Sequence, residues 1–343
     1  MVEGYTQTCV RIDLEKGEIK KEKLSDEFCK QYIGGYGFIT KILWDELTPG
    51  VDAFDPRNIL IFAIGPFPGT IVPTSSKYAV GAKSPLTGRI GFGISSGTIG
   101  AQMRRAGYDL VIIKGKAPEP VFIFFDDDNI SIIPCKDTLW GKDTWTVEDE
   151  IRNMYSDQRI AVSSCGQAGE KLSRFACLTN DRNRQVGRCG MGAVMGSKNL
   201  KALAFRGTKP IKVAKPTEFM AKAKELIKLA NGKETVKYRD LGTPVNTLAF
   251  NEVGVLPVKN FQTGYWDKAD SISGETMREK WVVKKAACGQ CPIACDHLCS
   301  TKDDKRWPNV ISSVDYEGLY SYGSVCLVDD FAALIKAIEL SDR

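Results

Sequence analysis

Up to about Gly207 the chain consists of short apolar runs separated by polar turns, which is the pattern of β-strands. The runs that predict strands are Thr8–Leu14, Ile59–Gly65, Tyr78–Ala82, Leu110–Lys114, Val121–Asp126, Ile130–Pro134, Arg159–Ser163 and Ala202–Arg206. The polar residues 126–129 separate two of these runs and predict a hairpin. Because the strands do not alternate strictly with helices, the pattern does not favour a doubly wound parallel sheet.

Helical periodicity predicts further elements between the strands. Phe38–Leu47 follows a glycine-rich turn, and Trp145–Tyr155 begins after Thr144, which we expect to be its N-cap. The segment Lys209–Pro216 contains two prolines, and after it the apolar spacing becomes mainly helical, starting with a helix that opens at Thr217. No internal repeat is visible in the sequence.

These patterns predict an α+β protein with two domains. Residues 1–208 are expected to form a strand-rich domain, and residues 209–343 a mainly α-helical one. The last predicted helix can be capped by Asp329 or Asp330 and runs to Arg343 without a stop signal. A helix that ends only because the chain ends leaves carbonyl groups unpaired, so we expect a chain that is truncated at its C-terminus, with a frayed natural terminus as the alternative.

Composition excludes several classes of protein. With 343 residues, of which 43% are hydrophobic, the chain can bury a substantial core. Its 47 Lys and Arg against 42 Asp and Glu give a net charge of +5, which is too small and too evenly spread to indicate nucleic-acid binding. No apolar run approaches the roughly 18 residues of a membrane helix, and the N-terminus lacks the features of a signal peptide. We therefore expect a cytoplasmic protein without a membrane or nucleic-acid partner.

One group of cysteines has the spacing of a metal site. Cys288, Cys291 and Cys295 form the pattern C-x2-C-x3-C, and three thiolates on a short loop suit an iron–sulfur cluster or zinc, with purely structural cysteines as a third interpretation. A zinc site would normally bring a second Cys or His pair roughly 12 or more residues away, but only Cys326 follows. The spacing thus favours an iron–sulfur cluster, whose fourth ligand is either Cys299 or a thiolate outside this chain.

The other cysteines and the single histidine do not indicate a second metal or catalytic site. Seven isolated cysteines are expected to be small buried residues: Cys9, Cys29, Cys135, Cys165, Cys177, Cys189 and Cys326. His297 is the only histidine, so Ser-His-Asp and Cys-His catalysis are excluded except through that residue, as is any multi-histidine metal site. We expect His297 to be a surface neighbour of the cysteine motif rather than a ligand.

Two glycine-rich turns are candidate anion-binding segments. Gly91–Thr98 leads into a predicted helix, where small residues leave backbone N–H groups free to bind a phosphate. Arg184–Gly192 combines arginines with flexible backbone, as a polyanionic ligand would require. Ordinary turns are the alternative for both. Neither matches the dinucleotide or the Walker pattern, so nicotinamide and nucleotide binding are not supported.

Several segments carry a family resemblance along nearly the whole chain. They are Ile33–Gly37, Gly65–Thr70, Lys83–Gly88, Ala106–Asp109, Gly166–Glu170, Gly192–Ala202, Pro257–Gly264 and the cysteine motif. In this order they resemble the aldehyde:ferredoxin oxidoreductase family. The resemblance implies a strand-rich N-terminal saddle domain that holds a tungsten (or molybdenum) bis-pterin cofactor, followed by helical domains.

The resemblance also implies the residues that contact each cofactor. The positions that would line the pterins are Lys77, Ser95, Ser96, Gly97, Arg184, Gly187, Arg188 and Asp342. The backbone carbonyls of Ile94 and Gln185 would hold a Mg²⁺ ion that joins the two pterin phosphates. Cys288, Cys291 and Cys295 would hold a [4Fe–4S] cluster beside one pterin.

The implied activity is the oxidation of small aldehydes or related carbonyl compounds to carboxylic acids. Electrons would pass one at a time through the cluster to ferredoxin or another iron–sulfur electron carrier. Glu317 matches a glutamate near the metal and could assist proton transfer. Further implied partners are a second copy in a homodimer, or a second subunit that completes the fold.

Departures from the family pattern define the alternatives. Family members are longer, and a second pterin-contacting motif, a fourth cluster cysteine and a histidine near the metal are absent from this chain. Lys77 replaces an arginine, and Lys336 and Glu339 occupy positions of iron ligands in some relatives, so we do not expect that iron. The alternatives are a shortened, non-catalytic electron-transfer or cofactor-binding subunit of a redox complex, or a structural remnant without metal. A related class reduces aromatic thioesters, but Pro257–Gly264 is closer to the aldehyde-oxidising branch.

Overall fold

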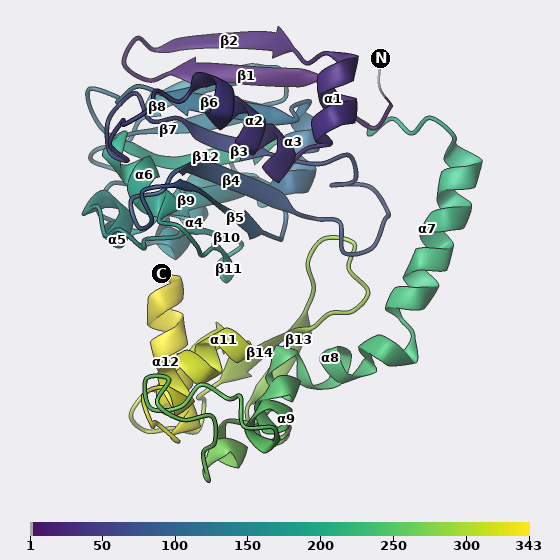
Figure 1. Ribbon diagram of the computed structural model, residues 1–343, viewed down its shortest axis with the longest axis vertical. Coiled ribbons are helices and arrows are strands. Elements are labelled where there is room, and N and C mark those ends of the chain that lie inside the picture. The colour runs from purple at the N-terminus through teal and green to yellow at the C-terminus, as the bar shows by residue number, and fades with distance from the viewer. Residues whose placement is uncertain (1–2) are drawn as a thin grey trace. The chain divides into compact units, whose positions relative to one another are not determined.

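The computed structural model describes residues 3–343. The chain divides into two compact units, which we call the N-terminal unit (Met1–Ala223, with Arg343) and the C-terminal unit (Lys224–Asp342). Two six-stranded sheets and their helices make up the first unit, and a three-stranded sheet with helices lies in the second (Figure 1). The predicted α+β class is confirmed.

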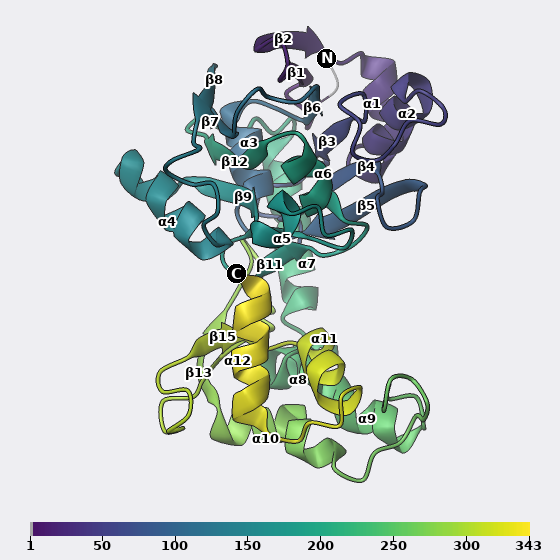
Figure 2. The same cartoon turned by 90° about the vertical axis from the view of Figure 1, so that its left-hand side faces the viewer.

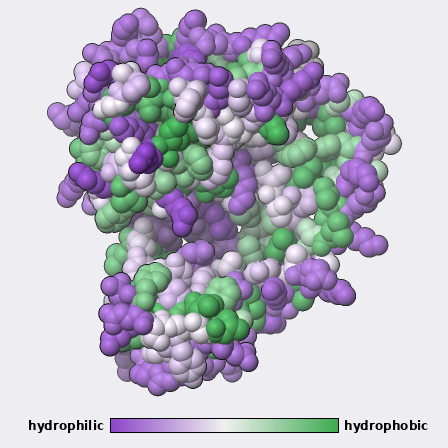
Figure 3. All heavy atoms as spheres, viewed as in Figure 1, coloured by the Kyte–Doolittle hydropathy of each residue, from purple (hydrophilic) through white to green (hydrophobic). Residues whose placement is uncertain are grey.

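The first sheet has the strand order β2-β1-β6-β3-β4-β5. Its strands are β1 (Thr8–Asp13), β2 (Glu18–Lys23), β3 (Leu60–Ala63), β4 (Tyr78–Lys83), β5 (Ile90–Ser95) and β6 (Leu110–Lys114). β1 and β6 pair in parallel, and every other neighbouring pair is antiparallel. β2 is polar and largely exposed, and the surface over β1 and β2 is mostly hydrophilic (Figure 3).

The second sheet repeats this path with new residues. Its strands are β7 (Val121–Asp126), β8 (Asn129–Pro134), β9 (Ala161–Cys165), β10 (Leu178–Asn180), β11 (Arg184–Val186) and β12 (Leu200–Arg206). Their order is β8-β7-β12-β9-β10-β11, and only β7 and β12 pair in parallel. In each sheet the first two strands form a hairpin and the next three are antiparallel to one another. The sixth strand lies between these two groups and pairs in parallel with the first strand. No internal repeat is visible in the sequence, yet both sheets follow the same strand path, which is built from dissimilar residues.

Helices cover the outer faces of both sheets and fill the space between them. They are α1 (Asp26–Tyr32), α2 (Tyr36–Glu46), α3 (Ile99–Ala106), α4 (Thr144–Met154), α5 (Gln167–Glu170) and α6 (Met191–Ser197). α1 and α2 pack on the first sheet around Phe38 and Ile39, and α4 packs on the second around Val147 and Ile151. The inner faces of both sheets share one core with α3 and α6, so strands such as β7 are apolar on both sides.

The C-terminal unit is mainly helical. Its elements are α8 (Val236–Leu241), α9 (Asn246–Glu252), α10 (Gly274–Lys280), β13 (Val282–Ala286), β14 (Asp296–Ser300), β15 (Ile311–Ser313), α11 (Tyr316–Leu319) and α12 (Phe331–Asp342), with short 3-10 and π turns between them. α7 (Pro216–Ala230) spans the boundary of the two units. α12 packs on the three-stranded sheet (Figure 2) and buries Leu334 and Ile335 in the core of this unit.

Most predicted elements are confirmed, and one local detail is wrong. Strands and helices occur at all the predicted runs, including the hairpin of β7 and β8. The N-cap of α4 is Asp143 rather than Thr144, because the Asp143 carboxylate accepts a hydrogen bond from the Thr146 backbone N–H. Within residues 3–343, no helix is both long and apolar enough to cross a membrane.

Candidate functional site

The first predicted cofactor segment is the turn that joins β5 to α3. Ile94 is exposed at the end of β5, Ser95 is buried, and Ser96 is half-buried. The Lys77 ammonium group is exposed and donates to Ser96 Oγ at 2.7 Å. The turn therefore presents a cation, a hydroxyl and backbone groups together at the surface of the N-terminal unit.

Gly97 is required by the geometry of this turn. Its φ of +100° lies in a region that other residues rarely adopt. A Cβ atom built on Gly97 would lie 2.0 Å from an Asp181 carboxylate oxygen and 2.7 Å from the Asn180 amide nitrogen. The turn can approach these two side chains only because position 97 has no side chain.

The second predicted segment is the turn that joins β11 to α6, and it occupies the corresponding place in the second sheet. Arg184 and Gln185 are half-buried in β11, and Gly187 and Arg188 are exposed beyond it. Both segments therefore follow the fifth strand of their sheet and precede the helix that leads to the sixth. The sequence predicts turns at Gly91–Thr98 and Arg184–Gly192, whereas the structure has edge strands over the first part of each, β5 at Ile90–Ser95 and β11 at Arg184–Val186.

The structure brings the two segments into contact. A Cβ atom on Gly93 of β5 would lie 2.7 Å from Val186 Cγ1, and one on Gly91 would lie 2.7 Å from Cys189 Cβ. The Ser84 hydroxyl also donates to the Cys189 carbonyl at 2.8 Å. Two glycine-rich turns, one from each sheet, thus present cationic side chains and backbone groups at neighbouring edges.

The cysteine motif lies on the loop between β13 and β14 in the C-terminal unit. Cys288, Cys291 and Cys295 are half-buried, and none of the chain's cysteines forms a disulfide within residues 3–343. The Cys291 N–H donates to the Cys288 carbonyl at 3.0 Å, which closes a tight turn. Gln290 (φ +59°) and Ala294 (φ +49°) adopt left-handed conformations immediately before Cys291 and Cys295. The loop is therefore sharply curved next to two of its thiols.

The thiols of this loop are not gathered around one point. Among residues 3–343, no three Cys, His, Asp or Glu side chains gather closely enough to hold one metal ion, whereas structural zinc needs four ligands around one centre. An iron–sulfur cluster needs a wider arrangement, because each thiolate binds a different iron atom of a bulky group. Three half-buried thiols on one short, curved loop are the type of donor that such a cluster uses.

Cys299 and His297 differ from their predicted surroundings. Cys299 is fully buried in the core beside β13, and burial raises the pKa of its thiol, so it is a poor thiolate donor. His297 was expected at the surface, but it is also fully buried. Its Nδ1 lies 3.1 Å from the Cys295 carbonyl oxygen, and its Nε2 has no hydrogen-bond partner in the described structure. Burial lowers the pKa of His297, so the neutral ring is favoured.

The remaining predicted residues lie at separate places in the C-terminal unit. Glu317 is exposed on α11, whose N-cap is Asp315. Asp342 is half-buried at the end of α12. Lys336 and Glu339 are joined by a 2.7 Å ion pair on the same helix.

The isolated cysteines mostly follow the prediction. Cys9, Cys29, Cys135 and Cys165 are buried, and burial raises the pKa of their thiols. Cys177 and Cys189 are half-buried, while Cys326 is exposed, which contradicts the expectation for that residue. Cys326 lies on a turn, where its Sγ contacts the Ser321 carbonyl at 3.3 Å.

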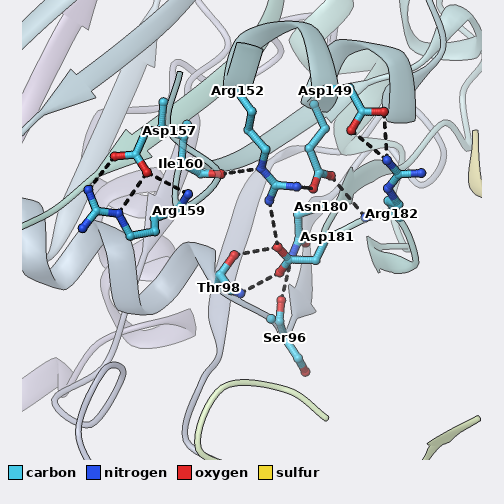
Figure 4. Close-up of polar contacts among 12 residues, drawn as sticks. Ser96, Thr98, Asp149, Arg152, Asp157, Arg159, Ile160, Asn180, Asp181 and Arg182 are labelled. Carbon is cyan, nitrogen blue, oxygen red and sulfur yellow. Dashed lines mark hydrogen bonds and ion pairs between the residues drawn. The ribbon is translucent and has the colours of Figure 1, made fainter. Parts of the chain in front are cut away.

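Sequence reasoning missed the residues that hold the first turn. Asn180 and Asp181 contact it through hydrogen bonds, and Arg152 on α4 lies next to Asp181 (Figure 4). Arg152 also pairs with Glu148 on the same helix. The dipeptide Asn-Asp between two short runs indicates a turn. Only the pairing of β10 with β9 and β11 brings that turn to the candidate site.

Comparisons with known families agree with this architecture. The model of the aldehyde ferredoxin oxidoreductase N-terminal domain matches residues 9–207, and the model of domains 2 and 3 of the same family matches residues 218–343. The chain therefore belongs to the aldehyde ferredoxin oxidoreductase family.

Several relatives carry informative names. The tungsten-containing aldehyde ferredoxin oxidoreductase of Pyrococcus furiosus is 39% identical over 97% of this chain and 55% of the relative, and that of Pyrococcus abyssi is 38% identical over 99% and 56%. The WOR-like subunit of aliphatic sulfonate oxidoreductase from Pyrococcus furiosus is 28% identical over 92% and 52%. The chain spans about half the length of the curated relatives it matches.

A solved structure has the same fold. The active-site complex BamBC of benzoyl coenzyme A reductase, bound to 1,5-dienoyl-CoA, aligns with a TM-score of 0.85 and 28% identity. The alignment covers 99% of this chain and 53% of that chain.

Proposed function

We propose that this chain holds a tungsten (or molybdenum) bis-pterin cofactor in its N-terminal unit and a [4Fe–4S] cluster in its C-terminal unit. The proposed reaction is oxidation of a small aldehyde or related carbonyl compound with water to a carboxylic acid, which releases two electrons and two protons. The electrons pass to ferredoxin or another iron–sulfur carrier. The names of the relatives support this chemistry. Because the chain covers about half of their length, the proposed reaction is assigned to the complete functional assembly.

The observation that carries the proposal is the contact between the two glycine-rich turns. Each follows the fifth strand of one sheet, and together they offer Lys77, Arg184 and Arg188 with exposed backbone groups. Two equivalent segments suit a cofactor with two pterin halves, each of which carries a phosphate. The carbonyls of Ile94 and Gln185 lie on these segments and are the proposed Mg²⁺ contacts.

The chain's own residues have distinct roles in this proposal. Lys77, Arg184 and Arg188 neutralise the phosphates, while Ser95, Ser96, Gly97 and Gly187 set the turns against the cofactor. Asp342 contributes a further pterin contact. When bound, the pterin-held metal would supply the two-electron redox change, and Glu317 would accept one of the two protons that the reaction releases.

The cysteine loop would hold the cluster through which electrons leave the active site. Cys288, Cys291 and Cys295 would each hold one iron atom of the cluster, and the fourth iron atom would need a ligand other than the buried Cys299. The support for this role is the curved loop with three half-buried thiols.

Metal analysis tests the proposal. The protein should be produced anaerobically in cells supplied with tungstate, and tungsten, pterin, iron and sulfide should be measured per chain. We expect tungsten with pterin, together with iron and sulfide. Cys291→Ser should lower iron and the cluster absorbance, whereas Cys326→Ser, which changes an exposed cysteine outside the motif, should leave both unchanged. Equal iron in the wild type and Cys291→Ser would refute the cluster assignment.

The second candidate function is an electron-transfer or cofactor-binding subunit. It is favoured by the similarity to a chain named as a subunit of a larger oxidoreductase and to the BamBC complex. Iron and sulfide without tungsten or pterin would support this function over the first.

A further inference from the structure

A buried polar network lies behind the first candidate turn, in the loop from β10 to β11. Asn180 ends β10 and is fully buried. Its Oδ1 accepts a hydrogen bond from Ser95 Oγ at 2.8 Å. Its Nδ2 donates to the Ser96 carbonyl at 2.8 Å, and Figure 4 shows both of these residues. One amide therefore fixes the side chain of one turn residue and the backbone of the next.

Asp181 binds the other end of the same turn. Its carboxylate accepts from the Thr98 backbone N–H and from Thr98 Oγ1, each at 2.6 Å, and it packs against Gly97 where no side chain fits. Asp181 and Arg182 both have positive φ, +47° and +65°. A conformation that such residues rarely adopt persists only where the surroundings fix it.

Those surroundings are side chains of α4. Arg152 Nη2 lies 3.8 Å from Asp181, its other amino group pairs with the Glu148 carboxylate, and its Nε donates to the Ile160 carbonyl at 3.0 Å. Glu148 in turn accepts from the Arg182 backbone N–H at 3.2 Å. The β10–β11 loop is thus bound to α4 on one side and to the β5–α3 turn on the other.

We infer that Asn180 and Asp181 are positioning residues for the candidate cofactor site. They connect the turn at residues 95–98, which follows β5 of the first sheet, with the loop between β10 and β11. That loop leads directly to Arg184 in the second sheet. A ligand that contacts both turns requires a fixed separation between them, and a preformed separation lowers the cost of binding. The inference rests on the proposed function.

Hydrogen exchange tests the clamp without relying on activity. In the cofactor-free full chain, Asp181→Ala should accelerate amide exchange at residues 96–98 and also at 184–188, by about tenfold or more, since a charge-assisted hydrogen bond shifts an opening equilibrium by that order. Thr98→Val keeps the side-chain shape but removes the hydroxyl, so it should give a smaller increase, and Thr98→Ser should restore slow exchange.

The matched control is Asp149→Asn, which removes an exposed partner of Arg182 and does not touch the turn. It should leave exchange at both segments as in the wild type. In protein loaded with tungsten, Asp181→Ala should lower tungsten and pterin per chain while iron stays constant. A simple loss of folding would lower both and would reduce the thermal midpoint.

The outcomes separate the inference from the proposed function. A wild type without tungsten or pterin refutes the proposed function, and the exchange data alone then decide whether Asp181 clamps both segments. If exchange in Asp181→Ala rises at neither segment, or at only one of them, the positioning role is overturned. Wild-type tungsten content in a folded Asp181→Ala protein would also overturn it.

Discussion

At the scale of single residues, Glu148 shows how burial changes the chemistry of the fold. It is buried on α4, and burial raises the pKa of its carboxyl to about 7, with Arg152 acting in the opposite direction. The folded chain therefore binds a proton at Glu148 more tightly than the unfolded chain does. Stability contributed by this proton is present at low pH and is lost as the pH rises from about 4.5 to about 7.

Glu148→Gln should remove this pH dependence. In urea unfolding at about pH 5 and about pH 8, the wild type should lose about 1–3 kcal/mol more stability than the variant between the two pH values. The comparison of variants also cancels the opposite contribution of His297, whose lowered pKa makes stability rise with pH. Glu150→Gln, which changes an exposed carboxylate on the same helix, should behave as the wild type. Parallel pH profiles for the wild type and Glu148→Gln would contradict the assignment.

A second residue-scale prediction concerns Glu317. Under the proposed function, Glu317→Gln keeps the size of the side chain but cannot accept a proton, so kcat should fall by about 10²–10⁴-fold. Tungsten and iron per chain should stay at wild-type values, since Glu317 is exposed on α11 and lies outside the cysteine loop. Steady-state rates with a small aldehyde and an artificial electron acceptor would measure the change. An unchanged kcat would remove Glu317 from the mechanism.

At the scale of elements, the close approach of β5 and β11 depends on glycine. Gly93→Ala should place a Cβ atom 2.7 Å from Val186 Cγ1, which requires the edge strands to move apart. We expect a loss of about 1–3 kcal/mol in unfolding free energy and faster hydrogen exchange in both strands. Gly65→Ala is the control, because a Cβ atom there meets nothing within 4 Å and its φ is not left-handed. Equal stability of the two variants would show that the strands tolerate separation.

The same elements show what sequence could and could not predict. β7 and β6 were predicted at their observed bounds because their runs are continuously apolar. The segments of β5 and β11 are predicted as turns, because β5 contains glycine, which is depleted in strands, and β11 has only three residues; pairing with β4 and β10 makes them strands. Candidate residues on those segments could be named from motifs, but the clamp at Asn180 depends on contacts between residues more than 80 positions apart.

At the scale of the whole molecule, the two sheets of the N-terminal unit depend on each other. Their inner faces form one core, in which Phe62 and Val80 of the first sheet join Ile123 and Phe205 of the second. Exposure of such a face to water costs about 25 cal/mol per Å² of apolar surface. We therefore expect neither sheet, with its own helices, to be stable without the other.

Fragment expression tests this dependence. A fragment of residues 1–116 should aggregate or lack a cooperative unfolding transition, whereas residues 1–223, which include both sheets, should unfold cooperatively. Circular dichroism during thermal unfolding and analytical size exclusion would measure both properties. A monomeric, cooperatively folded 1–116 fragment would show that the shared core is not needed.

The repeated strand path has an evolutionary consequence. A duplication of a shorter ancestral segment would produce this arrangement, and before fusion two copies would have had to associate to cover their apolar faces. In such a pair every substitution alters both copies at once. Within one polypeptide the two halves diverge independently, and Ser-Ser-Gly at residues 95–97, from the end of β5, now corresponds to Val-Gly-Arg at residues 186–188, from the end of β11. Fusion thereby permits an unequal pair of binding turns, which a symmetric ancestor could not have had.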